Sequence, residues 1–194
     1  MNVDGVVLAG GRSQRFGSDK SVATLNGRTL LATCHKAMAG AVGGRVYIAA
    51  GSRELVPWPA GAVRVADECS GAGPLAGITA ALACTRGAGV LVLACDLPRV
   101  RTATLHAIGA LGVARGRAVA ARGSRGWEPL LAFYPRAALQ QLRSGLREGP
   151  RALHLWLDRL GALAVTGIGA GELININRVS DLERLVRRQT RDRR

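Results

Sequence analysis

The sequence predicts an α/β fold in three layers, with helices on both faces of a mostly parallel β-sheet. Short runs of consecutive apolar residues, typical of buried parallel strands, alternate along the chain with segments whose apolar residues recur at helical spacing. Hydrophobic residues make up 48% of the chain and aromatic residues only 4%, so small aliphatic side chains must build the core. This alternation favours a layered α/β architecture.

The length of 194 residues suits one domain with a full core. Because we find no internal repeat and no dividing linker, we expect a single domain over residues 1–187. In its first half, to about residue 100, the predicted strands and helices alternate regularly, and in residues 101–187 they alternate less regularly. Residues 188–194 form a polar, basic tail that we expect to be frayed.

The expected strands of the first half are the apolar runs Val3–Leu8, Val46–Ala50, Val63–Ala66 and Val90–Cys95. The last is the most apolar run in the chain, which predicts that it is the central strand. Apolar residues at helical spacing predict one helix over Thr29–Met38. A second helix is expected after Gly73-Pro74, since proline is well tolerated at a helix start. Leu25–Arg28 is a predicted turn.

The second half is expected to hold shorter strands among several helices. The strands are Ala118–Ala121, Leu130–Tyr134 and, as a short strand or edge, Leu163–Thr166. The helices are Thr102–Leu111, Ala137–Leu146 and Ala152–Leu160. A terminal helix is predicted to start at Ser180, because Ser180 and Glu183 have the spacing of a capping box.

A glycine-rich loop follows the first expected strand. The apolar run ends in Gly10 and Gly11, and Arg15 and Lys20 come soon after. Paired glycines permit a positive φ and a close approach of the backbone, so that N–H groups can face phosphate oxygens. The two cations complete a predicted phosphate-binding loop, although its spacing differs from the P-loop and from the G-x-G-x-x-G fingerprint. Lys20 and Lys36 are the only lysines, which favours a specific need for an ammonium group at Lys20.

Two further expected strands end in an aspartate, the third at Asp67 and the fourth at Asp96. Since the carboxyl ends of parallel strands lie along one edge of a sheet, both aspartates are expected near the glycine loop. A carboxylate at the end of a buried strand suits a Mg²⁺ ion that is shared with phosphate oxygens. Asp96 is the predicted metal ligand. In the alternative interpretation, each aspartate only forms the turn after its strand.

The pattern Leu-Ala-Gly-Gly-x-x-x-Arg-Phe-Gly-x-Asp-Lys at residues 8–20 resembles the signature of the MobA-like nucleotidyltransferases, above all the molybdenum cofactor guanylyltransferases. Cys95-Asp96-Leu97-Pro98 resembles the family's C-D-x-P segment, and residues 73–77 resemble its G-P-L-A-G motif. Asn175-Ile176-Asn177 resembles its C-terminal N-x-N motif, with the polar face of an edge strand as the alternative. The resemblance extends from Val6 to about Leu185.

The resemblance implies a Rossmann-like sheet of the nucleotide-diphospho-sugar transferase type, with a nucleotide-binding half before about residue 100 and an acceptor-binding half after it. It implies Mg²⁺-dependent transfer of GMP from GTP to the terminal phosphate of molybdopterin, which forms molybdopterin guanine dinucleotide and pyrophosphate. The implied nucleotide-binding residues are Leu8, Ala9, Gly10, Gly11, Lys20, Asp67, Gly73, Gly77 and Asp96. The implied catalytic residues are Arg15, Lys20 and Asp96, with Asp96 as metal ligand, and the acceptor-binding residues are Asn175 and Asn177.

GTP and molybdopterin are thus the expected ligands, and other cofactor-biosynthesis proteins or molybdoenzyme chaperones the expected protein partners. The alternative is a molybdopterin cytidylyltransferase or a related enzyme that acts on a sugar phosphate. Gly10 favours the guanylyl branch, because the cytidylyl branch tends to have alanine there. The family often has an asparagine after its second strand that helps to bind guanine, whereas this chain has Ala49-Ala50-Gly51-Ser52. Backbone groups or Ser52 would then contact the base.

Two hypotheses of other classes remain. The first hypothesis is a nucleic-acid-binding module, and it is suggested by the net charge of +14. The chain lacks the aromatic stacking platforms of such modules, so nucleic acid is not an expected partner. The second hypothesis is a protein that carries the molybdenum cofactor and has no catalytic activity.

We expect a soluble, cytoplasmic protein. No apolar run reaches the roughly 20 residues of a membrane span, and the N-terminus lacks the pattern of a signal peptide. The cysteines Cys34, Cys69, Cys84 and Cys95 show no C-x-x-C spacing. We interpret them as small buried hydrophobic residues of a reducing compartment.

Overall fold

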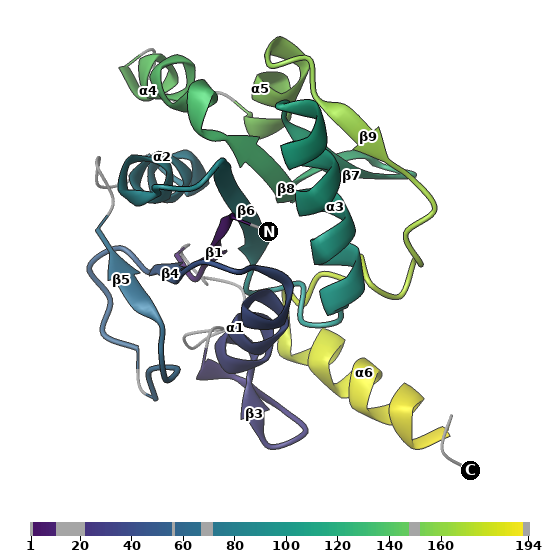
Figure 1. Cartoon of the computed structure of the whole chain (residues 1–194). Coiled ribbons are helices and arrows are strands. Elements are labelled where there is room, and N and C mark those ends of the chain that lie inside the picture. The colour runs from purple at the N-terminus through teal and green to yellow at the C-terminus, as the bar shows by residue number, and fades with distance from the viewer. Residues whose placement is uncertain (1, 11–21, 56, 67–71, 148–151, 192–194) are drawn as a thin grey trace.

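The computed structural model describes residues 2–10, 22–55, 57–66, 72–147 and 152–191, with the backbone alone for 186–191. Its centre is a seven-stranded sheet in the order β5-β4-β1-β6-β8-β7-β9, with helices packed on both faces (Figure 1). The predicted three-layer α/β architecture is confirmed. The boundary between a domain over 1–187 and a tail stays a prediction.

The four strands of the first half are parallel neighbours. They are β5 (Val63–Val65), β4 (Val46–Ala49), β1 (Asp4–Leu8) and β6 (Gly89–Ala94). Leu8, the last residue of β1, is level with Ala49 of β4 and Ala94 of β6. After β1 the chain adds β4 and β5 on one side of β1 and then returns to add β6 on the other side, so the strand order reverses at β1. Ligands of open α/β sheets bind at such a reversal of strand order, outside the carboxyl ends of the strands.

The second half adds three strands beside β6. β8 (Gly126–Pro135) is antiparallel to β6, β7 (Val119–Gly123) is antiparallel to β8, and β9 (Leu163–Val165) is parallel to β7 at the edge. β8 begins earlier than the predicted Leu130. Because Leu131 pairs with Leu93, residues 126–130 of β8 extend to the carboxyl end of β6 and beyond it.

In the described part of the chain, helices cover both faces of the sheet (Figure 1). α1 (Leu30–Ala41) and α3 (Thr102–Arg115) lie on one face, and α2 (Pro74–Cys84), α4 (Leu139–Arg147) and α5 (Leu153–Arg159) lie on the other. A short 3₁₀ turn over Arg136–Ala138 leads into α4. Thr29 caps α1 by accepting a hydrogen bond from Ala32 N at 3.0 Å. α3 runs past the predicted residue 111 and ends at Gly116, whose φ of 59° forms a left-handed cap.

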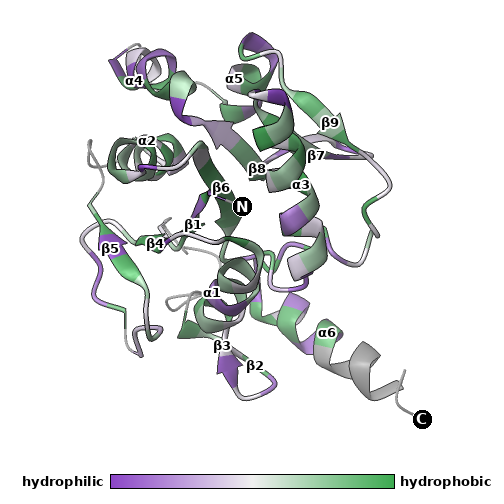
Figure 2. Ribbon diagram, viewed as in Figure 1, coloured by the Kyte–Doolittle hydropathy of each residue, from purple (hydrophilic) through white to green (hydrophobic). Residues whose placement is uncertain are grey.

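Alternate side chains of the central strands build two apolar cores. On β6, Leu91 and Leu93 belong to the core under α1 and α3, and Val90 and Val92 belong to the core under α2. All of β6 is buried, and it is hydrophobic along its length in Figure 2. It is also the middle strand of the sheet, as its apolar character predicts.

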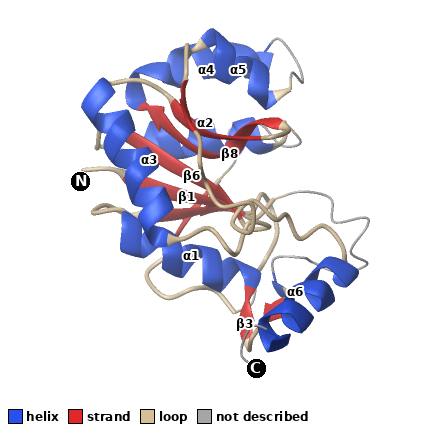
Figure 3. Cartoon of the chain, turned by 90° about the vertical axis from the view of Figure 1, so that its right-hand side faces the viewer, coloured by secondary structure: helices blue, strands red, loops and turns tan. Residues whose placement is uncertain are grey.

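A hairpin and the terminal helix lie beside the sheet (Figure 3). The hairpin is β2 (Thr24–Leu25) and β3 (Arg28–Thr29), joined by the predicted turn, and the helix is α6 (Val179–Arg191). These elements share a third apolar core, formed by Leu25, Leu30, Ile176 and Leu185.

The start and the end of α6 both differ from the prediction. The helix begins at Val179, and Asp181 Oδ2 accepts the N–H groups of Asn177 and Arg178 at 3.0 and 2.9 Å. Asp181 therefore takes the capping role that the pattern assigned to Ser180 and Glu183. The helix continues to Arg191, so the tail that we expected to be frayed from residue 188 is helical as far as 191.

None of the helices in the described ranges is both long and apolar enough to cross a lipid bilayer. Cys34 and Cys95 are buried as predicted, whereas Cys84 is exposed at the end of α2. The interpretation of Cys84 as a buried residue was wrong, because α2 ends there and turns its last residues to solvent. Cys69 lies outside the described residues.

Candidate active site

The carboxyl edge of the sheet collects most of the predicted site residues. Those that the structure describes are Leu8, Ala9, Gly10, Gly73, Gly77, Asp96, Asn175 and Asn177. The predicted residues Gly11, Arg15, Lys20 and Asp67 lie outside the described residues, and their roles stay predictions.

The end of β1 is tied to both neighbouring strands. Ala9 N donates to Ala49 O at 2.9 Å, and Cys95 N donates to Leu8 O at 3.1 Å. Leu8 and Ala9 are buried, and Gly10 is exposed. Of the predicted glycine pair, Gly10 does not use a positive φ and Gly11 lies outside the described residues; among the described atoms a Cβ at Gly10 would meet only Ala49 O, at 3.8 Å. Among the described residues, therefore, no steric obstacle requires glycine at this position.

Asp96 lies in the turn that follows β6. The N–H of Leu97 donates to Ala94 O at 3.1 Å and closes this turn. Asp96 is partly exposed, while its Oδ1 atom is buried. The carboxylate thus stands on a fixed backbone at the point where a buried strand meets solvent, as predicted.

The thiol of Cys34 supports this turn from α1. Its Sγ lies 3.6 Å from Cys95 O and 3.7 Å from Ala94 O, within hydrogen-bonding distance for sulfur. Burial raises the pKa of the Cys34 thiol well above its ordinary value, and the nearby Cys95 and Asp96 raise it further. Cys34 therefore stays a protonated donor to the turn. The helical spacing of Cys34 predicts its burial but not which carbonyl groups it meets.

The start of α2 offers a backbone N–H group at the same edge. Gly73 has a φ of 69°, which glycine adopts without strain, and Pro74 occupies the first helical positions. No described side chain caps this helix; Pro74 has no N–H group and Ala76 N donates to Gly73 O at 3.2 Å, so the N–H of Leu75 is the first-turn group that can bind an anion. Gly77, one turn further along, is buried.

The segment before α6 reaches this edge from the far end of the chain. Ile176 N donates to the backbone oxygen of Asp96 at 2.9 Å, and the Ile176 side chain is buried. Asn175 is partly buried and Asn177 is exposed. The segment is not a strand of the sheet, so the edge-strand interpretation was wrong. The hydrogen bond places the main chain between the two asparagines beside the main chain of Asp96.

Glu128 is a residue of this edge to which the sequence analysis assigned no role. It belongs to the part of β8 that extends past the end of β6. Burial raises the pKa of Glu128, the charge of Arg125 lowers it, and the negative charge of Asp96 raises it. Glu128 and Asp96 therefore interact electrostatically. Glu128 reaches this edge because β8 runs antiparallel to β6, and the apolar pattern of a strand does not encode its direction.

A profile of the MobA-like NTP transferase domain matches residues 5–162, more than half of the chain. The chain belongs to the MobA-like NTP transferase family. Among curated relatives, the "probable molybdenum cofactor guanylyltransferase" of Nostoc sp. is 34% identical over 192 residues, which cover 93% of this chain and 89% of the relative. The molybdenum cofactor guanylyltransferase of Pseudomonas aeruginosa is 34% identical over 176 residues, which cover 89% of this chain and 88% of the relative.

A solved structure shares the fold of this MobA-like chain. Molybdopterin-guanine dinucleotide biosynthesis protein A from Archaeoglobus fulgidus superimposes with a TM-score of 0.80, over 97% of this chain and 100% of that chain, at 24% identity. The predicted resemblance is thus confirmed, and the chain is a nucleotidyltransferase.

The donor groups of this MobA-like site determine which metals it could hold. In the described part of the chain, no group of three or more His, Cys, Asp and Glu side chains is placed to hold a metal ion by itself. The edge instead offers the carboxylate of Asp96, whose charge contributes to the raised pKa of Glu128. This set fits Mg²⁺, which binds one or two carboxylates and completes its shell with water and substrate phosphates.

Proposed function

We propose that this protein transfers GMP from GTP to the terminal phosphate of molybdopterin, with Mg²⁺ as the cofactor. The observation that carries the proposal is the 2.9 Å hydrogen bond from Ile176 N to the backbone oxygen of Asp96, which joins the main chain of the N-x-N segment to that of Asp96 at the ligand-binding edge. The relatives named molybdenum cofactor guanylyltransferase, which match 93% and 89% of the chain, support the choice of substrates.

In this proposal GTP lies over the ends of β1 and β4 and reaches the start of α2. Leu8 and Ala9 are buried and hydrogen-bonded to the neighbouring strands, so Gly10 follows a rigid base. The start of α2 carries the positive end of the helix dipole and favours the phosphates. Arg15 and Lys20 add positive charge there, and Asp67 contacts the nucleotide, as the family resemblance implies.

The reaction is a displacement at the α-phosphorus. An oxygen of the acceptor phosphate forms the new bond, and the bond from the α-phosphorus to the oxygen that bridges it to the β-phosphorus breaks, so pyrophosphate leaves. The attacking phosphate is an anion at neutral pH, so no general base is required. When bound to Asp96, Mg²⁺ would polarise the α-phosphate and neutralise its charge. The protein supplies positioning and charge on fixed elements.

The acceptor lies on the side of Asp96 formed by Asn175, Asn177 and β8. Asparagine amides both donate and accept hydrogen bonds, which suits a pterin ring with mixed polar groups. The backbone hydrogen bond of Ile176 fixes the main chain next to these asparagines against the main chain of Asp96. Glu128 adds a second carboxylate on this side.

The guanine base is recognised mainly by backbone groups after β4. Ala49 and Ala50 are buried and carry no polar side chain, and Ser52 is exposed. Gly51 has a φ of 61°, so the chain turns sharply there.

Product analysis tests the proposal directly. Purified protein with GTP, molybdopterin and Mg²⁺ should form equal amounts of dinucleotide and pyrophosphate, measured by liquid chromatography and mass spectrometry. Mixtures without molybdopterin are the control and should release no pyrophosphate. CTP in place of GTP should turn over at least about tenfold more slowly. Faster turnover of CTP would assign the cytidylyl reaction instead, and no product from either nucleotide would overturn the proposal.

A further inference from the structure

The chain between β9 and α6 crosses the ligand-binding edge without being part of a helix or a strand. We call residues 172–178 of this connection the C-terminal strap. Ile176 N donates to Asp96 O, and the side chain of Ile176 packs with Leu25 and Leu185. At its far end the strap is held by Asp181, which accepts the N–H groups of Asn177 and Arg178. The backbone of residues 176–178 is therefore fixed on both sides.

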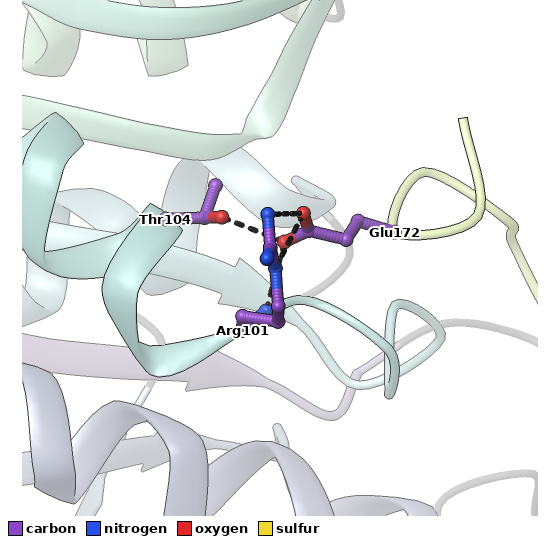
Figure 4. A network of polar contacts seen from close by, with 3 residues as sticks. All are labelled: Arg101, Thr104 and Glu172. Carbon is purple, nitrogen blue, oxygen red and sulfur yellow. Dashed lines mark hydrogen bonds and ion pairs between the residues drawn. The ribbon is translucent and has the colours of Figure 1, made fainter. Parts of the chain in front are cut away.

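The near end of the strap is held by one carboxylate, that of Glu172 (Figure 4). Its Oε2 accepts the backbone N–H of Arg101 at 3.0 Å and the hydroxyl of Thr104 at 2.7 Å. Its Oε1 accepts Arg101 Nε at 2.8 Å and lies 2.7 Å from the terminal Nη2 of the same guanidinium. Both oxygens are used, and the residue is only 7% exposed.

The partners of Glu172 belong to the connection that also carries Asp96. Arg101 is the N-cap residue of α3, and Thr104 lies in the first turn of that helix. The connection is short and internally bonded, with Leu97 N donating to Ala94 O at 3.1 Å and Val100 N donating to Leu97 O at 3.3 Å. Glu172 thus ties the strap to the same rigid piece of chain that presents Asp96.

The charge of Glu172 suits this task. Burial opposes the ionised form of Glu172, but hydrogen bonds from Arg101 and Thr104 and the charge of Arg101 outweigh burial, so the pKa of Glu172 is lowered. A negative group at the start of α3 also interacts favourably with the helix dipole. Glu172 is therefore ionised at neutral pH, and all its contacts are charge-assisted.

We propose that Glu172 is a positioning residue of the transfer reaction, which holds Asn175 and Asn177 at the acceptor side of Asp96 by latching the strap to the start of α3. This inference rests on the proposed function, because it assigns the strap to acceptor binding. It adds a residue outside the family-like motifs, more than 65 positions along the chain from its partners Arg101 and Thr104.

Replacement by glutamine breaks the latch although the side chain keeps its shape. Glu172 meets only donors: two from Arg101 on Oε1, and a backbone N–H and a hydroxyl on Oε2. The amide of a glutamine side chain at this position must turn its NH₂ group toward one of these pairs, so either the guanidinium or the Arg101 N–H would face another donor. Glu172→Gln is therefore the main variant. Glu183→Gln is the matched control, because Glu183 is exposed on α6.

Steady-state kinetics give the first readout. Glu172→Gln should raise KM for molybdopterin by about tenfold, since charge-assisted hydrogen bonds that order the strap are lost, and should leave KM for GTP within about twofold. Glu183→Gln should change neither. Equal increases in both KM values would show a general loss of structure and overturn the proposal, as would an unchanged KM for molybdopterin.

Hydrogen exchange gives a readout that does not depend on catalysis. In Glu172→Gln the amide of Ile176 should exchange at least about tenfold faster than in the wild type, while β6 amides keep their protection. Unchanged exchange would overturn the latch. If the wild type forms no dinucleotide, the proposed function fails, and the exchange data still decide whether Glu172 holds the strap. Thr104→Val, which removes one contact and keeps the side-chain shape, replaces the glutamine variant if that variant does not fold, with a smaller change in the same direction expected.

Discussion

The two edges of the central sheet use the same residue types for different purposes. At the amino edge, Asp4 is buried at the start of β1, where it accepts hydrogen bonds from Arg45 N at 2.7 Å and from the Thr85 hydroxyl at 2.6 Å. At the carboxyl edge, Asp96 is partly exposed in a turn after the neighbouring strand β6. The first aspartate closes the end of the sheet, and the second stands where a ligand can reach it.

The glycines of the two edges differ in the same way. A Cβ at Gly44 would overlap Asp4 and lie 2.8 Å from Val3 O, and one at Gly89 would overlap Tyr134 O and lie 2.9 Å from the Cα of Pro135. At Gly10, by contrast, the nearest described atom would be 3.8 Å away. Packing thus requires glycine at Gly44 and Gly89, whereas no described atom requires it at Gly10. We interpret the space beside Gly10, among the described atoms, as room for a ligand.

The largest expected difference is between the effects of Asp96→Asn and Asp4→Asn on turnover and on stability. Asp96→Asn should lower kcat for GMP transfer by about 10²–10³-fold, because the loss of the carboxylate weakens the hold on the Mg²⁺ that would neutralise the reacting phosphates. Asp4→Asn should instead lower the free energy of unfolding by about 2 kcal/mol, because a buried acceptor loses its charge, and should leave kcat per folded molecule unchanged. Initial rates and urea unfolding of both variants measure the contrast. Near-normal turnover by Asp96→Asn would remove Asp96 from the chemistry.

A second contrast compares two alanine substitutions. Gly89→Ala should destabilise the protein by about 3 kcal/mol, because its methyl group overlaps backbone atoms that cannot move away. Gly10→Ala should leave the melting temperature within about 2 °C and weaken GTP binding by about tenfold, because its methyl group enters the space above the edge. Differential scanning fluorimetry with and without GTP compares the two. A destabilised Gly10→Ala, or one that binds GTP normally, would contradict this interpretation of Gly10.

The strand ends at the carboxyl edge could be predicted from the sequence, whereas the residues that pack around Asp96 could not. Apolar runs that end in Gly10 and Asp96 are enough to predict strand ends, because a buried parallel strand and its abrupt end are local properties. The neighbours of Asp96 depend on long-range packing. Neither the antiparallel direction of β8, which brings in Glu128, nor the latch of Glu172 on Arg101 leaves a local pattern.

A titration tests whether Glu128 faces the site. The charge of Asp96 is one cause of the raised pKa of Glu128, after burial. Asp96→Asn removes this charge, so the pKa of Glu128 should fall toward its ordinary value, measured by carbon-13 NMR of the carboxyl group. Asp4→Asn, at the opposite edge, serves as the control and should not move it. The same pKa in both variants would show that Glu128 and Asp96 do not interact.

The smallest expected effect concerns two thiols. Cys84 is exposed at the end of α2, whereas Cys34 is buried under the Asp96 turn, with a raised pKa. At pH 8, Cys84→Ser should remove one rapidly reacting thiol in a titration with Ellman's reagent, since only the thiolate reacts. Cys34→Ser should leave the rapid phase unchanged. Rapid labelling of Cys34 would show that the turn under Asp96 opens in solution.

Calorimetric titration of GTP and CTP, each with and without Mg²⁺, tests the central claim most directly. The claim is that the open edge of the sheet is a Mg²⁺-dependent site for GTP, built around Asp96. It predicts binding of GTP at least about tenfold tighter with Mg²⁺ than without it, a clear preference over CTP, and loss of the Mg²⁺ effect in Asp96→Asn. Equal affinity for GTP with and without Mg²⁺, or an unchanged Mg²⁺ effect in Asp96→Asn, would contradict it.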